Sequence, residues 1–212
     1  MLRSVSGFWV IMKAAVFGGH AKELALLMRQ DPGFDVNEVQ DENGSTLLHY
    51  ACGVDSRSAV IPLLLAHPDI DVNVIDDSGW TPFYYACRYG RASSVREMLK
   101  DSRVEVKELT KDGFAPLWSA AYFGHLEVIK WWIASGREMN LGRPRDVDKT
   151  DAIGAAKKEG KKEVVTLLER FKSDAAKTRS EVRKQFAING QNPYSSCDSI
   201  LFLFSSFFIL SS

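Results

Sequence analysis

A short sequence phrase recurs four times in this chain, and successive copies are spaced 34 to 36 residues apart. The first three copies join a glycine-bearing turn to a run of small and apolar residues. The copies occupy residues 44–52, 79–87, 113–121 and, in a degraded form, 151–156. A period of this length is typical of stacked structural units, none of which can bury its apolar face alone. The pattern therefore predicts a repeat array that offers a surface for holding a partner, with no chemistry required.

Each unit reads as a turn, a helix, a second turn and a second helix. Thr46 and Thr81 are placed to cap a first helix, because a threonine hydroxyl accepts a hydrogen bond from a free helical N–H. Pro82 and Pro116 fall at the first helical position, where a missing N–H costs nothing. The first helices are expected to end at a residue in the left-handed conformation. The candidates are Gly90, Gly124, Gly160 and, in the second unit, Asp55.

The second helices carry apolar residues at three- and four-residue spacing. A related stretch at residues 19–27 indicates one further unit before the first phrase. Pro62 falls inside a second helix, and we expect it to lie in the first turn of that helix or to bend it.

These residues resemble the ankyrin repeat, whose signature Thr-Pro-Leu-His-x-Ala is almost complete at residues 46–51 and 81–86. The resemblance covers about residues 8–171. It implies an all-α, ankyrin-like solenoid of about five helix–turn–helix repeats with connecting hairpin fingers. Only His49 keeps the family histidine. We therefore expect the middle three units to be regular and the outer two to act as caps with polar outer faces.

The C-terminal end differs from the array in charge. Residues 1–156 carry 17 Lys/Arg and 21 Asp/Glu, whereas residues 157–184 carry 10 and 5. The sequence predicts a basic C-terminal helix over residues 172–186. A solvated cap explains its charge, and contact with an acidic partner or an anionic membrane is the alternative. A linker over residues 187–199 and an apolar tail over residues 200–212 follow.

The tail is far more apolar than the rest of the chain. The run from Ile200 to Leu210 has 11 residues, fewer than the roughly 17 to 20 that a membrane-spanning helix needs. Three interpretations remain: a marginal membrane anchor, an end that docks on the stack, or a translated sequence without selected structure. A membrane-tethered scaffold is the alternative function that depends wholly on this run.

The cysteines indicate a reducing environment. Cys52 and Cys87 occupy the same slot of successive units, where a small apolar residue is wanted, and we expect both in the core. Cys197 lies in the linker. Because these cysteines do not form a disulfide framework, we expect an intracellular protein, in the cytoplasm or alternatively the nucleus.

The sequence does not contain a recognisable catalytic motif. His20, His49 and His125 lie in turn or signature slots that the repeat explains. The glycines recur at the repeat period instead of clustering in a phosphate-binding loop. No cysteine–histidine pair has the spacing of zinc ligands. We expect a non-enzymatic scaffold or adaptor without cofactor or metal, and an enzyme is the weakest alternative.

The resemblance also implies a concave partner-binding face formed by finger tips and first helices. Matching its positions to one unit gives Glu42, Asn43, Ser45, Gly53 and Val54. The next two units supply the predicted partner-binding residues, which are Asp77, Trp80, Arg88, Tyr89, Lys111, Asp112, Phe114, Tyr122 and Phe123. Exposed aromatic residues beside an arginine are typical of interface hot spots.

The alternative is that several of these rings pack against the next unit. Trp132 is expected in the core because it fills a leucine slot, whereas Trp131 fits either position. If the surface interpretation holds, Trp80→Ala with Phe114→Ala abolishes partner capture and leaves the thermal midpoint nearly unchanged. The array is acidic, so we expect another protein as the partner and no nucleic acid. We expect a monomer, either complete or part of a larger protein.

Overall fold

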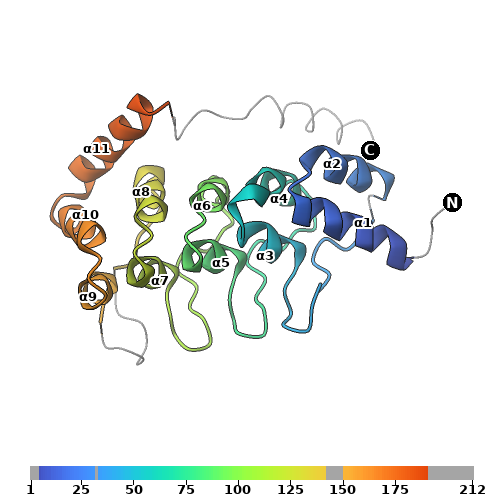
Figure 1. The fold of residues 1–212 in the computed structure, drawn as a ribbon, viewed down its shortest axis with the longest axis horizontal. Helices are drawn as coiled ribbons and strands as arrows, with labels where there is room; N and C mark the ends of the chain where they lie inside the picture. The colour runs from blue at the N-terminus through green and yellow to red at the C-terminus, as the bar shows by residue number, and fades with distance from the viewer. Residues whose placement is uncertain (1–4, 32, 142–149, 191–212) are drawn as a thin grey trace.

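The computed structural model describes residues 5–31, 33–141 and 150–190, which form helices in two rows with long loops between units (Figure 1). The inner row contains α3 (Leu47–Cys52), α5 (Pro82–Arg88), α7 (Pro116–Phe123) and α9 (Ala152–Lys158). The outer row contains α2 (Ala21–Gln30), α4 (Ile61–Leu65), α6 (Ala92–Met98), α8 (Leu126–Ser135) and α10 (Lys162–Ser173). The remaining elements are α1 (Val5–Gly18), the 3-10 helix η1 (Asp55–Val60) and α11 (Ala175–Ile188).

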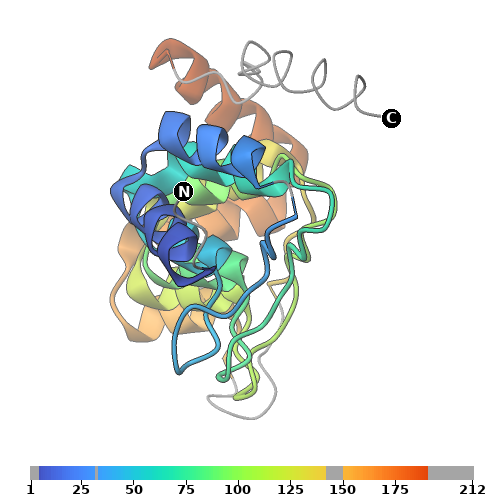
Figure 2. The same ribbon diagram turned by 90° about the vertical axis from the view of Figure 1, so that its right-hand side faces the viewer.

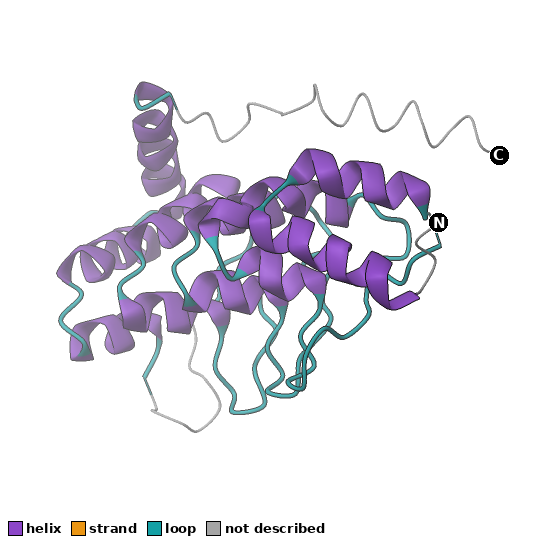
Figure 3. Cartoon of the chain, turned by 45° about the vertical axis from the view of Figure 1, so that its right-hand side comes forward, coloured by secondary structure: helices purple, strands orange, loops and turns teal. Residues whose placement is uncertain are grey.

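The two rows make the predicted all-α solenoid. Each inner helix packs against the next inner helix along the chain, and α6 packs against α8 in the outer row. Viewed along the stack, the loops between units project to one side as fingers (Figure 2). Helices and loops account for the described part of the chain, without a strand (Figure 3). The prediction of fold class is confirmed.

The helix boundaries follow the caps that the sequence predicts. The Thr81 hydroxyl accepts a hydrogen bond from the Tyr84 N–H at 3.1 Å, and Pro82 begins α5. Gly90, Gly124 and Gly160 all have positive φ at the ends of inner helices, a conformation that glycine adopts without steric cost. Pro62 lies in the first turn of α4, as expected.

Asp55 does not take the left-handed conformation that its slot predicts. The inner helix of that unit ends at Cys52, Gly53 stays right-handed and Val54 is extended, so Asp55 begins η1 instead. Its carboxylate accepts a hydrogen bond from the Ser93 N–H at 3.0 Å, in the first turn of α6. A side chain there serves the neighbouring helix, which a glycine cannot do.

One continuous core runs through the stack. Cys52 and Cys87 are fully buried, unpaired thiols, and burial raises the pKa of both. Trp132 is buried and meets Phe83 edge-on, with ring centroids 5.0 Å apart. These core assignments are therefore confirmed.

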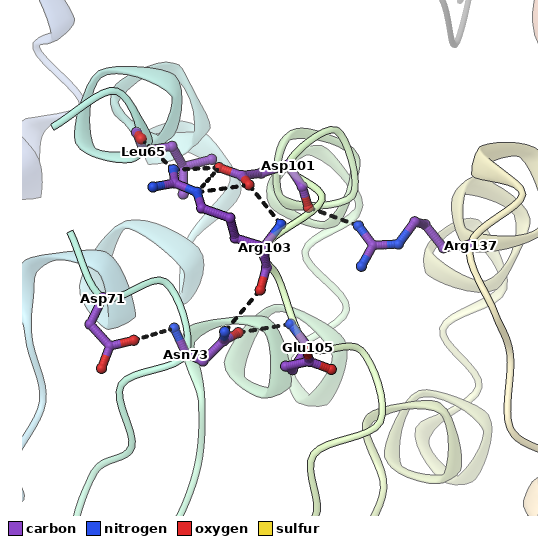
Figure 4. A network of polar contacts seen from close by, with 7 residues as sticks. All are labelled: Leu65, Asp71, Asn73, Asp101, Arg103, Glu105 and Arg137. Atoms are coloured by element: carbon purple, nitrogen blue, oxygen red, sulfur yellow. Dashed lines mark hydrogen bonds and ion pairs between the residues drawn. The ribbon is translucent and has the colours of Figure 1, made fainter. Parts of the chain in front are cut away.

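Polar contacts tie the loop of one unit to the loop of the next (Figure 4). The Asn73 side chain donates to the Arg103 carbonyl at 2.9 Å and accepts from the Glu105 N–H at 2.7 Å. Arg103 pairs with Asp101 and donates to the Leu65 carbonyl at 2.6 Å. These side chains provide hydrogen-bond partners for backbone groups of the loops, which are not paired with one another in a sheet.

The two ends of the stack differ from the expected polar caps. At the N-terminal end Val10, Ile11 and Leu26 are exposed, and Leu26 is 56% exposed. Val10 and Ile11 stand in the slots that hold the cap and the first helical residue in other units. Because α1 continues past these slots, their side chains reach the surface. The outer face of the first unit is thus partly apolar, which corrects the prediction.

At the other end, α11 packs across α8 and α10 on the side of the outer row (Figure 1). Phe186 stacks on Trp131 with ring centroids 4.0 Å apart. Arg179 and Arg183 donate to the carbonyls of Ile133 and Ala134 at 3.2 and 2.7 Å. Both carbonyls lie in the last turn of α8, where cations are favourable. Trp131 is therefore buried, and part of the predicted basic charge binds the array.

Candidate functional site

The predicted partner-binding residues lie on one surface, which we call the inner face. It consists of α3, α5, α7 and the finger residues 41–45, 76–80 and 110–114. The exposed members of the predicted set are Asp77, Tyr89, Lys111, Asp112 and Phe123. The half-buried members are Trp80, Arg88, Phe114 and Tyr122. The set is thus divided between free surface and rings that also pack on their own unit.

An aspartate shapes each of the first two fingers. Asp76 accepts hydrogen bonds from the N–H groups of Ser78 and Trp80 at 2.9 and 2.8 Å. Its second oxygen accepts from the Tyr85 hydroxyl at 2.9 Å. Burial raises the pKa of Tyr85 to about 12, and the bond to Asp76 adds to the shift. Tyr85 therefore stays neutral and fixes the finger to α5.

The first finger repeats this arrangement one unit earlier. Asp41 accepts from the N–H groups of Asn43 and Ser45, and the Tyr50 hydroxyl donates to it at 2.5 Å. Ser45 is only 3% exposed, and its hydroxyl is 3.4 Å from that of Tyr85 in the next unit. The expectation that Ser45 faces a partner is therefore wrong.

Lys111 links two fingers. Its ammonium group donates to the Asp77 carbonyl, and its own N–H donates to the Ser78 carbonyl at 3.2 Å. In turn the Asp77 N–H donates to the Asn43 carbonyl at 2.9 Å. The three finger tips are thus joined in a row, and part of the role predicted for Lys111 is structural.

Aromatic rings form two adjoining groups on the inner face. In the first, the ring centroids of Trp80 and Tyr85 are 5.4 Å apart, and those of Tyr85 and Tyr89 are 5.8 Å apart. Tyr89 has 44% of its surface exposed. The half-buried Trp80 ring also contacts Tyr84, with ring centroids 5.0 Å apart, so one part of the ring packs on its own unit and the other part is exposed.

The second group belongs to the third finger and α7. The ring centroids of Phe114 and Trp118 are 4.7 Å apart, and Trp118 stacks on Tyr122 with centroids 5.0 Å apart. The ring centroids of Tyr122 and Phe123 are 4.9 Å apart, and Phe123 is 37% exposed. Phe114 and Tyr122 pack against a small buried cluster around Trp118.

Arg88 precedes Tyr89 of the first group in sequence and contacts Phe123 of the second. Its guanidinium carbon lies 3.8 Å from the centroid of the Phe123 ring, within cation–π distance. Its backbone carbonyl is 3.1 Å from Nε2 of His125. Burial lowers the pKa of His125, so the neutral ring donates to that carbonyl. Inner helices α5 and α7 are thereby held together at their C-terminal ends.

Sequence reasoning missed Tyr85 and Phe17. Phe17 lies 4.5 Å from Tyr50, with the Arg57 guanidinium 4.5 Å from its ring. Tyr50 and Tyr85 lie 35 residues apart in the same slot of the signature, and that repetition could have identified Tyr85 as part of the row of aromatic rings. Phe17 belongs to a unit without the signature, so only its position before Gly19 marks it.

The described residues include no group of three or more His, Cys, Asp or Glu that could hold a metal ion. His49 is buried in a cap: its Nδ1 accepts from the Thr46 N–H at 3.1 Å, and its Nε2 is 2.9 Å from the Trp80 carbonyl. No helix in the described ranges combines the length and apolar character needed to cross a bilayer. The predicted tail and most of the linker, with Cys197, lie outside these ranges.

Comparisons with known proteins place the repeats in a family. Residues 11–108 match the family model described as ankyrin repeats (3 copies). The human SMC5-SMC6 complex localization factor protein 1 is 43% identical over 94 residues, which are 44% of this chain and 9% of that protein. Human Rabankyrin-5 is 29% identical over 136 residues, 64% of this chain and 11% of the relative.

A yeast protein, the target of rapamycin complex 2 subunit AVO2 of Saccharomyces cerevisiae, is 32% identical over 98 residues. These are 46% of this chain and 22% of the yeast protein. The chain thus spans from about a tenth to about a fifth of the relatives' lengths.

Proposed function

Because this chain is an ankyrin repeat protein, and therefore a protein-interaction module, we propose that it binds a partner protein on the inner face. The partner-binding residues are Trp80, Asp77, Arg88, Tyr89, Lys111, Asp112, Phe114, Tyr122 and Phe123. The array acts as a non-enzymatic scaffold or adaptor. A preformed stack loses little conformational entropy when it binds, so affinity comes from the contacts themselves.

The exposed pair of Tyr89 and Phe123 is the observation that carries this proposal. Tyr89 directly follows Arg88 at the end of α5, and Phe123, at the end of the neighbouring inner helix α7, lies against the Arg88 guanidinium group. Aromatic side chains and arginine are enriched among residues that dominate binding energy. Both rings are fixed by contacts with Tyr85 and Tyr122, so ordering them on binding costs little.

The names of the relatives agree with this class of function. One is a localization factor for a protein complex and another is a subunit of a complex. We extend only the general role to this chain, that of a module within a larger assembly. We also propose that the chain is intracellular, since Cys52 and Cys87 are unpaired thiols, and that it acts as a monomer.

The test is quantitative affinity capture from cell lysate with the full chain and a Tyr89→Ala/Phe123→Ala variant. These rings are better targets than Trp80 and Phe114, whose half-buried rings also support the fold. Ile188→Ala, an apolar truncation at an 85% exposed position on α11, is the matched control. We expect specific partners to be lost with the double variant and retained with the control, at equal thermal midpoints. Retention of the same partners by both variants would refute the assignment of the inner face.

A further inference from the structure

We infer that Arg88 forms a recognition position for a carboxylate, supplied by an aspartate or glutamate of the partner with an apolar side chain next to it. This inference rests on the proposed function and specifies the partner's chemistry at the centre of the inner face. The site consists of Arg88, Tyr89 and Phe123.

The geometry of Arg88 leaves its donors available. The guanidinium group lies over the Phe123 ring at 3.8 Å, so stacking fixes its position without using its N–H groups. Among the described residues no carboxylate forms an ion pair with Arg88, and no hydrogen bond from its side chain is found. By contrast, Arg96, Arg103 and Arg170 each pair with an acid. Arg88 is therefore a half-buried, preorganised cation without a counter-ion.

The surroundings of Arg88 add positive charge. Arg91, the residue before α6, donates to the Gly53 carbonyl at 2.8 Å, and both Arg91 and Arg88 act electrostatically on His125. The Lys161 side chain lies over Gly124: a Cβ atom added to Gly124 would be 2.7 Å from Cδ of Lys161. His125, between these cations, stays neutral. The C-terminal carbonyls of α5 offset part of this charge, and among the described residues no carboxylate pairs with Arg88, so an acidic group from outside is favoured.

The shape of the site favours a carboxylate beside an apolar side chain. Tyr89 and Phe123 are the two most exposed rings of the inner face, at 44% and 37%. A guanidinium fork matches the two oxygens of a carboxylate, and a single such group suits a single negative charge. Arg91 is already engaged with Gly53, so the anion is held by the single guanidinium fork of Arg88, and we take the singly charged carboxylate as the favoured ligand over a phosphate group. The favoured ligand is thus an acidic residue adjoining an apolar one in an extended segment.

The experiment is selection of a phage-displayed random dodecapeptide library on the full chain, on Arg88→Glu and on Tyr89→Ala/Phe123→Ala. We expect peptides selected by the native chain to be enriched in Asp or Glu at one position beside an apolar residue. In a synthetic peptide from the selection, replacing that acid with Gln should weaken binding by about tenfold or more. The Arg88→Glu chain should lose the acidic peptides and should recover affinity for the peptide in which the acid is replaced by Lys.

Several outcomes would overturn the inference. Selected peptides without acidic enrichment that are still lost on Tyr89→Ala/Phe123→Ala would leave the inner face as the binding surface and exclude the carboxylate. Acidic enrichment that persists on Arg88→Glu would place the anion elsewhere. Peptides that bind all variants equally, or no selected peptides at all, would count against the inference and the proposed function together. Circular dichroism of each variant checks that the stack is intact.

Discussion

Phe186→Ala should detach α11 from the stack. Phe186 is only 2% exposed and stacks on Trp131, with an angle of 13° between the rings. Truncating a buried phenylalanine costs about 3–5 kcal/mol. The other anchors of α11 include buried Thr178 and Val182, the Arg170–Glu181 ion pair with α10 and the two arginine–carbonyl bonds at the end of α8. Phe186 is the largest side chain among these anchors, so a loss of about 3 kcal/mol is large relative to the docking of one terminal helix.

The expected effect is local because stability in a repeat array depends on contacts between neighbours. Amide hydrogen exchange measured by mass spectrometry should show peptides from α11 exchanging about 100-fold faster in the variant, the factor that corresponds to about 3 kcal/mol. Peptides from α5 and α6 should keep their protection. The fluorescence of Trp131 should shift towards that of a hydrated indole as the ring becomes exposed.

Two results would refute this reasoning. Unchanged exchange in α11 would mean that the stacked pair contributes little to docking. Equal loss of protection in α5 and α11 would mean that the array unfolds as one unit and that α11 is part of it. Ile188→Ala, on the same helix, should change stability by less than about 0.5 kcal/mol, since Ile188 is 85% exposed.

Three further predictions concern the contacts between units. Burial lowers the pKa of His49 below its ordinary value of 6.5, so the unfolded chain binds the proton first as pH falls. The free energy of unfolding, measured with urea, should therefore have its full value above about pH 6.5 and fall below that pH. The fall should be smaller in His49→Gln. Asn73→Ala removes both side-chain bonds of Figure 4 and should cost about 1–2 kcal/mol in the same titration; an unchanged midpoint would contradict that. Gly79→Ala should cost more than Gly160→Ala, because both have positive φ but only the first brings a new carbon to 2.8 Å from the Lys111 nitrogen. Equal losses would show that backbone strain alone matters.

The sequence was sufficient to predict the elements that each unit encodes locally. Thr81, Pro82 and Gly90 define one inner helix by capping and backbone conformation, and neighbours do not alter those preferences. Contacts between units were harder to predict. Asp55 stands in a glycine slot because it caps α6 of the next unit, 38 residues away in sequence. No local pattern carries that information.

The candidate site was predictable to the same extent. Slot matching predicted which residues lie on the inner face, apart from Tyr85, because their positions follow from the period. Their exposure depends on the neighbouring unit: Tyr85 of the next unit contacts Ser45, and Lys111 binds the finger beside it. The burial of Trp131 depends on Phe186, 55 positions away, in a helix that belongs to no repeat.

The division between buried and exposed rings determines which variants can separate binding from folding. Trp80, Phe114 and Tyr122 are half-buried and pack on their own unit. Truncating one of these rings would therefore change the stability of the fold as well as the proposed binding. Tyr89 and Phe123 lie at the ends of these ring contacts, and little packs beyond them. Phe186 lies on the outer row, away from the inner face. In a stack governed by neighbour contacts, Phe186→Ala should leave peptide binding at Arg88 unchanged, whereas Tyr89→Ala/Phe123→Ala should leave the exchange of α11 unchanged. Measuring both properties on both variants tests whether the binding surface and the C-terminal helix are independent.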